Sequence, residues 1–132
     1  MEKISYAYTQ DVVLLHKTPK VGTWQCVALV QHYANAPATV WWAPGEDVLG
    51  NQLIQPGTAI ATFEDGVYKN LPHGNHAALF VKHDGQGFWI LDQWTNKQEV
   101  SMRLIRRKGK DQYGKWKDAS NNADAFSIIE HK

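Results

Sequence analysis

Apolar residues repeat at helical spacing in one early stretch of the chain. The repeat consists of Val27, Val30 and Ala34, with Ala28 and Leu29 widening the same face. Asn35-Ala36-Pro37 follows, and the residue before a proline resists helical backbone angles. The pattern therefore predicts a helix that begins near Cys26 and stops near residue 35.

Later apolar runs are shorter and are separated by turn residues, which is typical of β-strands. The predicted strands are 58–63, 76–82, 88–94, 100–104 and 125–129. The turn at 83–87 makes the second and third of these a hairpin, and the first strand of that hairpin, apolar on both faces, is expected to be central. The segment 11–15 reads as either a helical turn or a strand, whereas 39–45 and 108–122 read as loops. A helix followed by an antiparallel meander, with 125–129 closing the sheet, predicts an α+β fold for one domain spanning 1–132.

Composition limits the classes of function. The 132 residues are 43% hydrophobic and 20% charged, with a net charge of +1, which does not favour nucleic-acid or membrane partners. Half of the basic residues fall between Arg103 and Lys117, and a solvated face is the ordinary interpretation. One cysteine excludes an internal disulfide, and no Cys/His cluster has metal-site spacing, so no metal or cofactor is expected.

The segment Met1–Tyr6 lacks the basic start and apolar run of a signal peptide, and no eighteen successive residues are apolar. We therefore expect a protein made in the cytoplasm that leaves it, if at all, by another route.

Cys26 is the candidate nucleophile because the first turn of a helix favours the thiolate. A lone cysteine is more often a small core residue, so a base and an orienting group are needed. His76 opens one hairpin strand and Asp92 lies near the end of the other, which makes them near neighbours in an antiparallel pair. A satisfied buried histidine is the alternative for His76, and Gln93 becomes the orienting group if a bulge changes the register.

This relay predicts that His76 takes the Cys26 proton and that the thiolate attacks an amide carbonyl. The Cys26 N–H would face the oxyanion, with Gln25 or Thr23 as a second donor. Substrate contacts are expected from a set of aromatic and amide residues: Trp24, Gln25, Trp41, Trp42, Gln93 and Trp94. Adjacent Trp41 and Trp42 either line a groove or divide between core and surface, and Trp24 either narrows the cleft or belongs to the core.

Four segments carry a resemblance to known families: 25–28, 55–60, 75–80 and 90–94. They resemble the NlpC/P60 and CHAP amidases. More closely, the segments 22–31, 56–63, 74–80 and 92–94 resemble the BPSL0067 family, which is grouped with type VI secretion amidase effectors. The resemblance runs from about residue 21 to 104, with a weaker match at 125–130. It implies a papain-like fold and a peptidoglycan amidase with Cys26 as nucleophile, His76 as base and Asp92 as orienting group. It also implies injection into the periplasm of a rival cell by a secretion apparatus and a cognate immunity protein.

Three alternatives stay open at this level. The chain could be a cell-wall lysin with the same triad, a non-catalytic aromatic-rich binding module, or a cysteine-dependent acyltransferase. The bond that is cut, within the stem peptide or at its cross-link, does not follow from the sequence.

Overall fold

The computed structural model describes residues 4–132, and residues 1–3, which open the segment used against a signal peptide, lie outside the described residues. The described elements are the helix α1 (Cys26–Ala34) and six strands: β1 (Trp42–Asp47), β2 (Ala59–Thr62), β3 (Ala77–Asp84), β4 (Gly87–Asp92), β5 (Ser101–Arg106) and β6 (Phe126–His131). Four short 3-10 turns join them: η1 (Val12–Leu15), η2 (Thr39–Trp41), η3 (Ala119–Asn121) and η4 (Ala123–Ala125).

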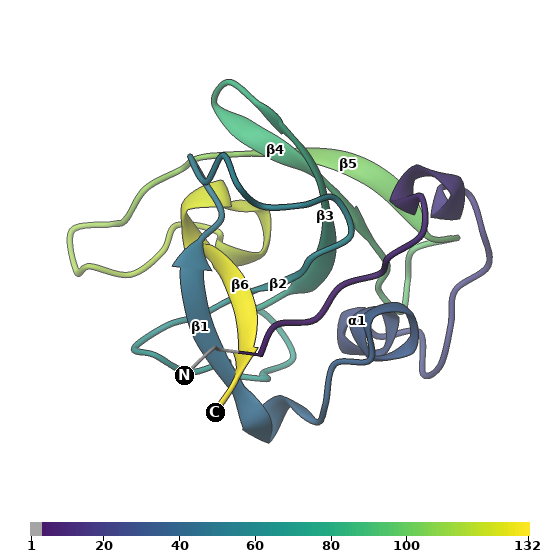
Figure 1. Cartoon of the computed structure of the whole chain (residues 1–132). Helices are drawn as coiled ribbons and strands as arrows, with labels where there is room; N and C mark the ends of the chain where they lie inside the picture. The colour runs from purple at the N-terminus through teal and green to yellow at the C-terminus, as the bar shows by residue number, and fades with distance from the viewer. Residues whose placement is uncertain (1–3) are drawn as a thin grey trace.

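The strands form one antiparallel sheet in the order β1-β6-β2-β3-β4-β5 (Figure 1). The predicted α+β class and the meander from β2 to β5 are confirmed. One expectation was wrong: residues 39–45 are not a loop, because β1 begins at Trp42. Strand β6 joins the sheet, and it lies between β1 and β2. Pro44 is tolerated in β1 because this is an edge strand, where a missing N–H costs no ladder bond.

The helix packs against β3 (Figure 1). Its residues Leu29, Val30 and Ala34 are buried in the core that they share with β3. Asn35 ends the helix in the left-handed conformation, at φ 60°, and its N–H donates to the Val30 carbonyl. The predicted helix boundaries are therefore confirmed, and Asn35 is the physical stop signal.

Strand β3 is buried on both faces, as its continuous apolar run predicted. Ala77 and Leu79 belong to the core beneath α1, whereas Ala78 and Phe80 belong to a second core on the opposite face. Within the described chain, no helix is both long and apolar enough to cross a membrane.

Candidate active site

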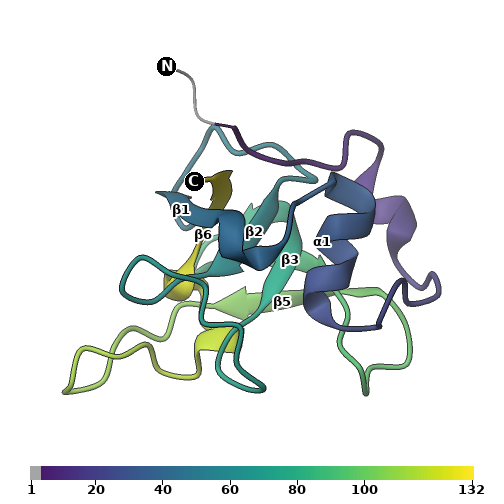
Figure 2. The same ribbon diagram turned by 90° about the horizontal axis from the view of Figure 1, so that it is seen from below.

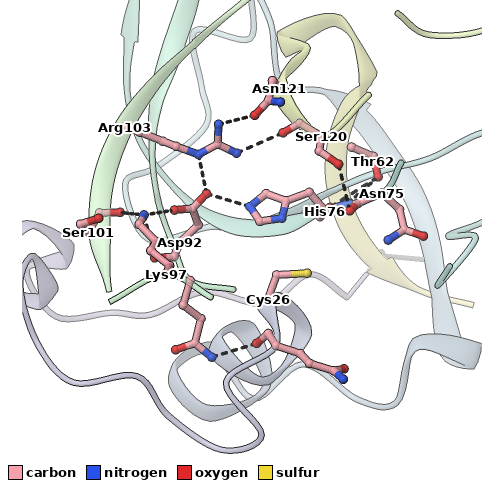
Figure 3. Close-up of polar contacts among 12 residues, drawn as sticks. Cys26, Thr62, Asn75, His76, Asp92, Lys97, Ser101, Arg103, Ser120 and Asn121 are labelled. Carbon is pink, nitrogen blue, oxygen red and sulfur yellow. Dashed lines mark hydrogen bonds and ion pairs between the residues drawn. The ribbon is translucent and has the colours of Figure 1, made fainter. Parts of the chain in front are cut away.

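Three elements of the fold bring Cys26, His76 and Asp92 together. Cys26 is the first residue of α1, His76 directly precedes β3, and Asp92 is the last residue of β4. The β3–β4 register pairs Leu79 with Leu91, so His76 and Asp92 lie on the same face as diagonal neighbours. Their side chains are joined by a 2.7 Å contact between His76 Nε2 and Asp92 Oδ2 (Figure 3). The predicted proximity of this pair is therefore confirmed.

The register also decides between Asp92 and Gln93 as the partner of the histidine. A bulge does occur in this pair, but it lies between Phe80 and Lys82, beyond the histidine end of the strand. Asp92 therefore keeps the face of His76, and Gln93 points to the opposite one.

The Asp92 carboxylate is fully buried and carries two further cationic partners. Lys97 Nζ donates to Oδ1, and Arg103 Nε donates to Oδ2 at 2.7 Å (Figure 3). Burial alone would raise the pKa of Asp92, but hydrogen bonding and attraction to His76, together with Arg103 and Lys97, hold it well below its usual range. Asp92 is therefore a fixed negative charge behind the imidazole.

His76 lies between Asp92 and Cys26, as Figure 3 shows. Because Nε2 bonds to Asp92, Nδ1 is the nitrogen left for the thiol. Burial lowers the pKa of His76, but its bonds to Asp92 and Cys26 outweigh burial and raise the pKa to about 9. The backbone of the histidine is fixed by Thr62, whose Oγ1 accepts from the His76 N–H at 3.0 Å.

The pKa of the Cys26 thiol is shifted in the opposite direction. Burial raises its pKa, but hydrogen bonding and attraction to His76 outweigh burial, with smaller help from the Ala77 N–H and the Tyr68 hydroxyl. The net pKa is lowered, which favours a thiolate beside an imidazolium. This is the state that an attacking cysteine requires.

The sulfur opens into a cleft of about 810 Å³. Its walls come from the start of α1, from the loop 70–76 between β2 and β3, from 94–96 after β4, and from 118–121. Figure 2 shows the loops of these regions at one end of the sheet. A cleft of this size accommodates a peptide, and its walls are mainly neutral and polar.

Two of the six expected substrate residues line this cleft, namely Gln25 and Trp94. Trp24 is 50% exposed beneath the Lys20 ammonium, 4.0 Å from its ring centroid, and is not among the residues that line the cleft. The structure therefore brings only part of this set to the nucleophile.

The other three expectations need correction because those side chains are used in the fold. Trp42 is buried and donates from Nε1 to the Pro37 carbonyl, and Trp41 stacks on His131 at the end of β6. Gln93 is fully buried, where its amide bonds to Val21 and to the Gln25 carbonyl. Gln93 thus anchors the loop that precedes α1, and does not touch the cleft.

Sequence reasoning missed three residues of the site: Tyr68, Lys97 and Arg103. The Tyr68 hydroxyl lies 3.8 Å from Cys26 Sγ, but its loop carries no motif. Arg103 was read as part of a basic face. One signal in the sequence pointed to Arg103. A buried carboxylate such as Asp92 needs a cationic partner, and the strand β5 that carries Arg103 pairs with β4.

Among residues 4–132, no three His, Cys, Asp or Glu side chains are grouped so that they could hold a metal ion. The geometry is that of a cysteine, a histidine and a carboxylate placed at an open cleft.

Comparison with known proteins identifies the family. A family model described as domesticated amidase effector 2 matches residues 6–129, which is nearly the whole chain. The chain belongs to the domesticated amidase effector 2 family.

Relatives of this family member include a type VI secretion amidase effector 2 protein of Salmonella typhi, 43% identical over 132 residues, with 95% of this chain and 98% of that protein covered. A domesticated amidase effector 2 of Ixodes scapularis is 35% identical over 124 residues, with 86% and 80% covered. A solved structure of type 6 secretion amidase effector 2 superposes with a TM-score of 0.89 at 41% identity, covering 96% of this chain and 95% of that one. The finer resemblance to the BPSL0067 and NlpC/P60–CHAP groups stays a prediction.

Proposed function

We propose that this chain is a peptidoglycan amidase that cuts amide bonds of the stem peptides by a Cys26–His76–Asp92 mechanism. The observation that carries the proposal is the 2.7 Å contact between His76 and the fully buried carboxyl group of Asp92, with Cys26 at the edge of an open cleft. The amidase names of its relatives supply the class of reaction and, with the wall-hydrolase resemblance, the substrate.

The chemistry follows from the positions of these groups. The Cys26 thiolate attacks the carbonyl carbon, and the carbonyl electron pair moves onto oxygen near the N-terminal N–H groups of α1. When that pair returns, the carbon–nitrogen bond breaks and His76 gives its Nδ1 proton to the departing amine. Water, deprotonated by His76, then hydrolyses the thioester and frees Cys26.

Asp92 acts on this cycle through His76. Its contact with Nε2 fixes the ring so that Nδ1 faces the sulfur, and its negative charge stabilises the imidazolium. Trp94 and Gln25, which both line the cleft, are proposed substrate contacts.

We further propose that the protein is an antibacterial type VI secretion effector, made in the cytoplasm and delivered by a secretion apparatus to the periplasm of a target cell. Its relatives with that name support this role. A cognate immunity protein would then protect the producing cell, and the open cleft is the surface that such a partner would need to cover. A papain-like NlpC/P60 relationship is part of the same proposal.

The test is a digest of purified peptidoglycan sacculi, followed by chromatography and mass spectrometry of the released fragments. Wild type is expected to release new muropeptides whose masses identify the bond, either D-Glu–diaminopimelate or the diaminopimelate–D-Ala cross-link. Cys26→Ala is expected to release none, because it lacks the nucleophile.

The matched control is His32→Gln, which changes an exposed residue of the same helix outside the cleft. It should digest sacculi like wild type. Folded wild-type protein that leaves sacculi unchanged, or equal digestion by Cys26→Ala, would contradict the proposal.

A further inference from the structure

The hydroxyl of Tyr68 lies next to the sulfur but outside the Cys26–His76–Asp92 relay, although it helps to lower the pKa of Cys26. Tyr68 is 8% exposed, and its Oη lies 3.8 Å from Cys26 Sγ. Among the residues that the structure describes, the thiol is its only hydrogen-bond partner. The same tyrosine lines the open cleft, so the phenol borders both the sulfur and the space that a substrate would enter. Besides its contact with the thiol, the hydroxyl is therefore placed to act on a group that binds beside the sulfur.

The ring of Tyr68 is held firmly by other aromatic residues. Trp42 lies 4.8 Å from it and Phe63 lies 6.5 Å from it, between ring centroids. Trp42 is itself fixed by the 2.9 Å bond from its Nε1 to the Pro37 carbonyl. Because Tyr68 also lines the cleft, its hydroxyl is a donor fixed in advance at the place where substrate meets the sulfur.

The surroundings of the hydroxyl favour its protonated form. Burial, and then the charge and hydrogen bond of the neighbouring Cys26 thiolate, raise the pKa of Tyr68 well above its usual range. A neutral phenol beside an anionic centre can only donate. It gains most when a full negative charge develops on an oxygen, which is a better acceptor than sulfur.

We infer that Tyr68 is a catalytic residue that donates a hydrogen bond from Oη to the oxyanion formed when Cys26 attacks the amide. This inference rests on the proposed function of Cys26. As the Sγ–carbon bond forms, the carbonyl pair moves onto oxygen, and Tyr68 keeps its proton while donating to that oxygen. When the pair returns, the carbon–nitrogen bond breaks and the amine takes its proton from His76, so Tyr68 ends unchanged.

The position of Oη fits this role. The oxyanion is two bonds from Sγ, so a donor 3.8 Å from the sulfur is within reach of the separation of about 2.7–3.1 Å that such donors need. Tyr68 would thus be the second donor beside the Cys26 N–H, in place of the Gln25 or Thr23 suggested by the sequence. The Gln25 carbonyl is held by Gln93, which fixes the backbone on the other side of the sulfur.

The experiment compares two reactions of Cys26 in the full chain. Acylation by p-nitrophenyl acetate passes through a tetrahedral oxyanion, whereas alkylation by iodoacetamide does not. Tyr68→Phe keeps the ring and removes the donor, so we expect acylation to slow by about tenfold or more, on the order of what a lost oxyanion donor costs. Alkylation should change by less than about twofold, because the thiolate is held mainly by His76. The matched control Tyr33→Phe removes another phenol of the same core and should change neither rate.

Each other outcome overturns the inference. Unchanged acylation in Tyr68→Phe, or an equal loss in both reactions, would show that the hydroxyl does not act on an oxyanion. A wild-type Cys26 that reacts with neither reagent would overturn the proposed nucleophile, and the role of Tyr68 with it. Should Tyr68→Phe fail to fold, 3-fluorotyrosine at position 68 keeps the ring and makes the phenol a stronger donor. It is expected to speed acylation without speeding alkylation, and an unchanged acylation rate would refute the inference.

Discussion

Asp92 differs from the simple orienting carboxylate that the sequence predicted, because three cationic groups share it. Besides His76, it accepts from Lys97 Nζ and from Arg103 Nε. Arg103 also donates to Asn121 Oδ1 and to the Ser120 carbonyl, so its guanidinium ties the carboxylate to a wall of the cleft. Lys97 and Arg103 partly neutralise the charge of Asp92, so that Asp92 stabilises the imidazolium less. At the scale of residues, these cations therefore set how strongly His76 holds its proton.

Replacing Arg103 by methionine should therefore raise the pKa of His76 above about 9. The sign follows because the substitution removes a cation close to the imidazolium and leaves Asp92 with less compensation. Arg103→Lys keeps the charge and should shift the pKa less. Nuclear magnetic resonance titration of the His76 ring measures both, and an unchanged pKa in Arg103→Met would contradict this account of Asp92.

At the scale of elements, the nucleophile depends on the loop before α1, and one side chain of the sheet anchors that loop. Gln93 Oε1 accepts from the Val21 N–H at 2.9 Å, and its Nε2 donates to the carbonyls of Val21 and Gln25. Gln25 is the N-cap of α1, directly before Cys26. Cys26 is therefore positioned by two adjacent residues at the end of β4. Asp92 acts through His76, and Gln93 acts through the backbone of the loop before α1.

Gln93→Leu should lower the free energy of unfolding by about 2–4 kcal/mol, because part-buried backbone groups lose their partners. It should also slow alkylation of Cys26 under conditions in which the variant is fully folded, since the start of α1 is released. Gln31→Leu, an exposed change on the same helix, is the matched control. Denaturant unfolding and the alkylation rate give the two readings. A destabilised variant whose Cys26 is alkylated at the wild-type rate would refute the anchoring role.

The local pattern of apolar and turn residues predicted those elements that form as their own sequence favours. The apolar spacing and Pro37 defined α1, and β2 to β5 followed from apolar runs and tight turns. Strand β1 was missed because Pro44 and Gly45 resemble a turn, and only pairing with β6 makes them a strand. The place of β6 could not be predicted either, since a strand that joins the sheet between earlier strands is a long-range choice.

At the scale of the whole molecule, the site draws on residues far apart in the sequence. The antiparallel rule predicted that His76 meets Asp92, because that pair depends on a single hairpin. Tyr68 and Arg103 reach the same place through the path of a loop and the pairing of another strand, and no local spacing encodes either contact. The comparisons bear on the fold, which matches a solved type 6 secretion amidase effector 2 over 96% of this chain.

The account rests most directly on a thiolate at Cys26 held by His76, and the pH dependence of alkylation by iodoacetamide measures it. Because the pKa of Cys26 is lowered, the rate should reach half its maximum below the value of about 8.5 typical of a free cysteine. Asp92→Asn should move that midpoint upward. The neutral amide stabilises a protonated His76 less, and the thiolate then loses part of its positive partner. A wild-type midpoint at or above about 8.5, or a thiol that does not react in the native protein, would contradict the central claim.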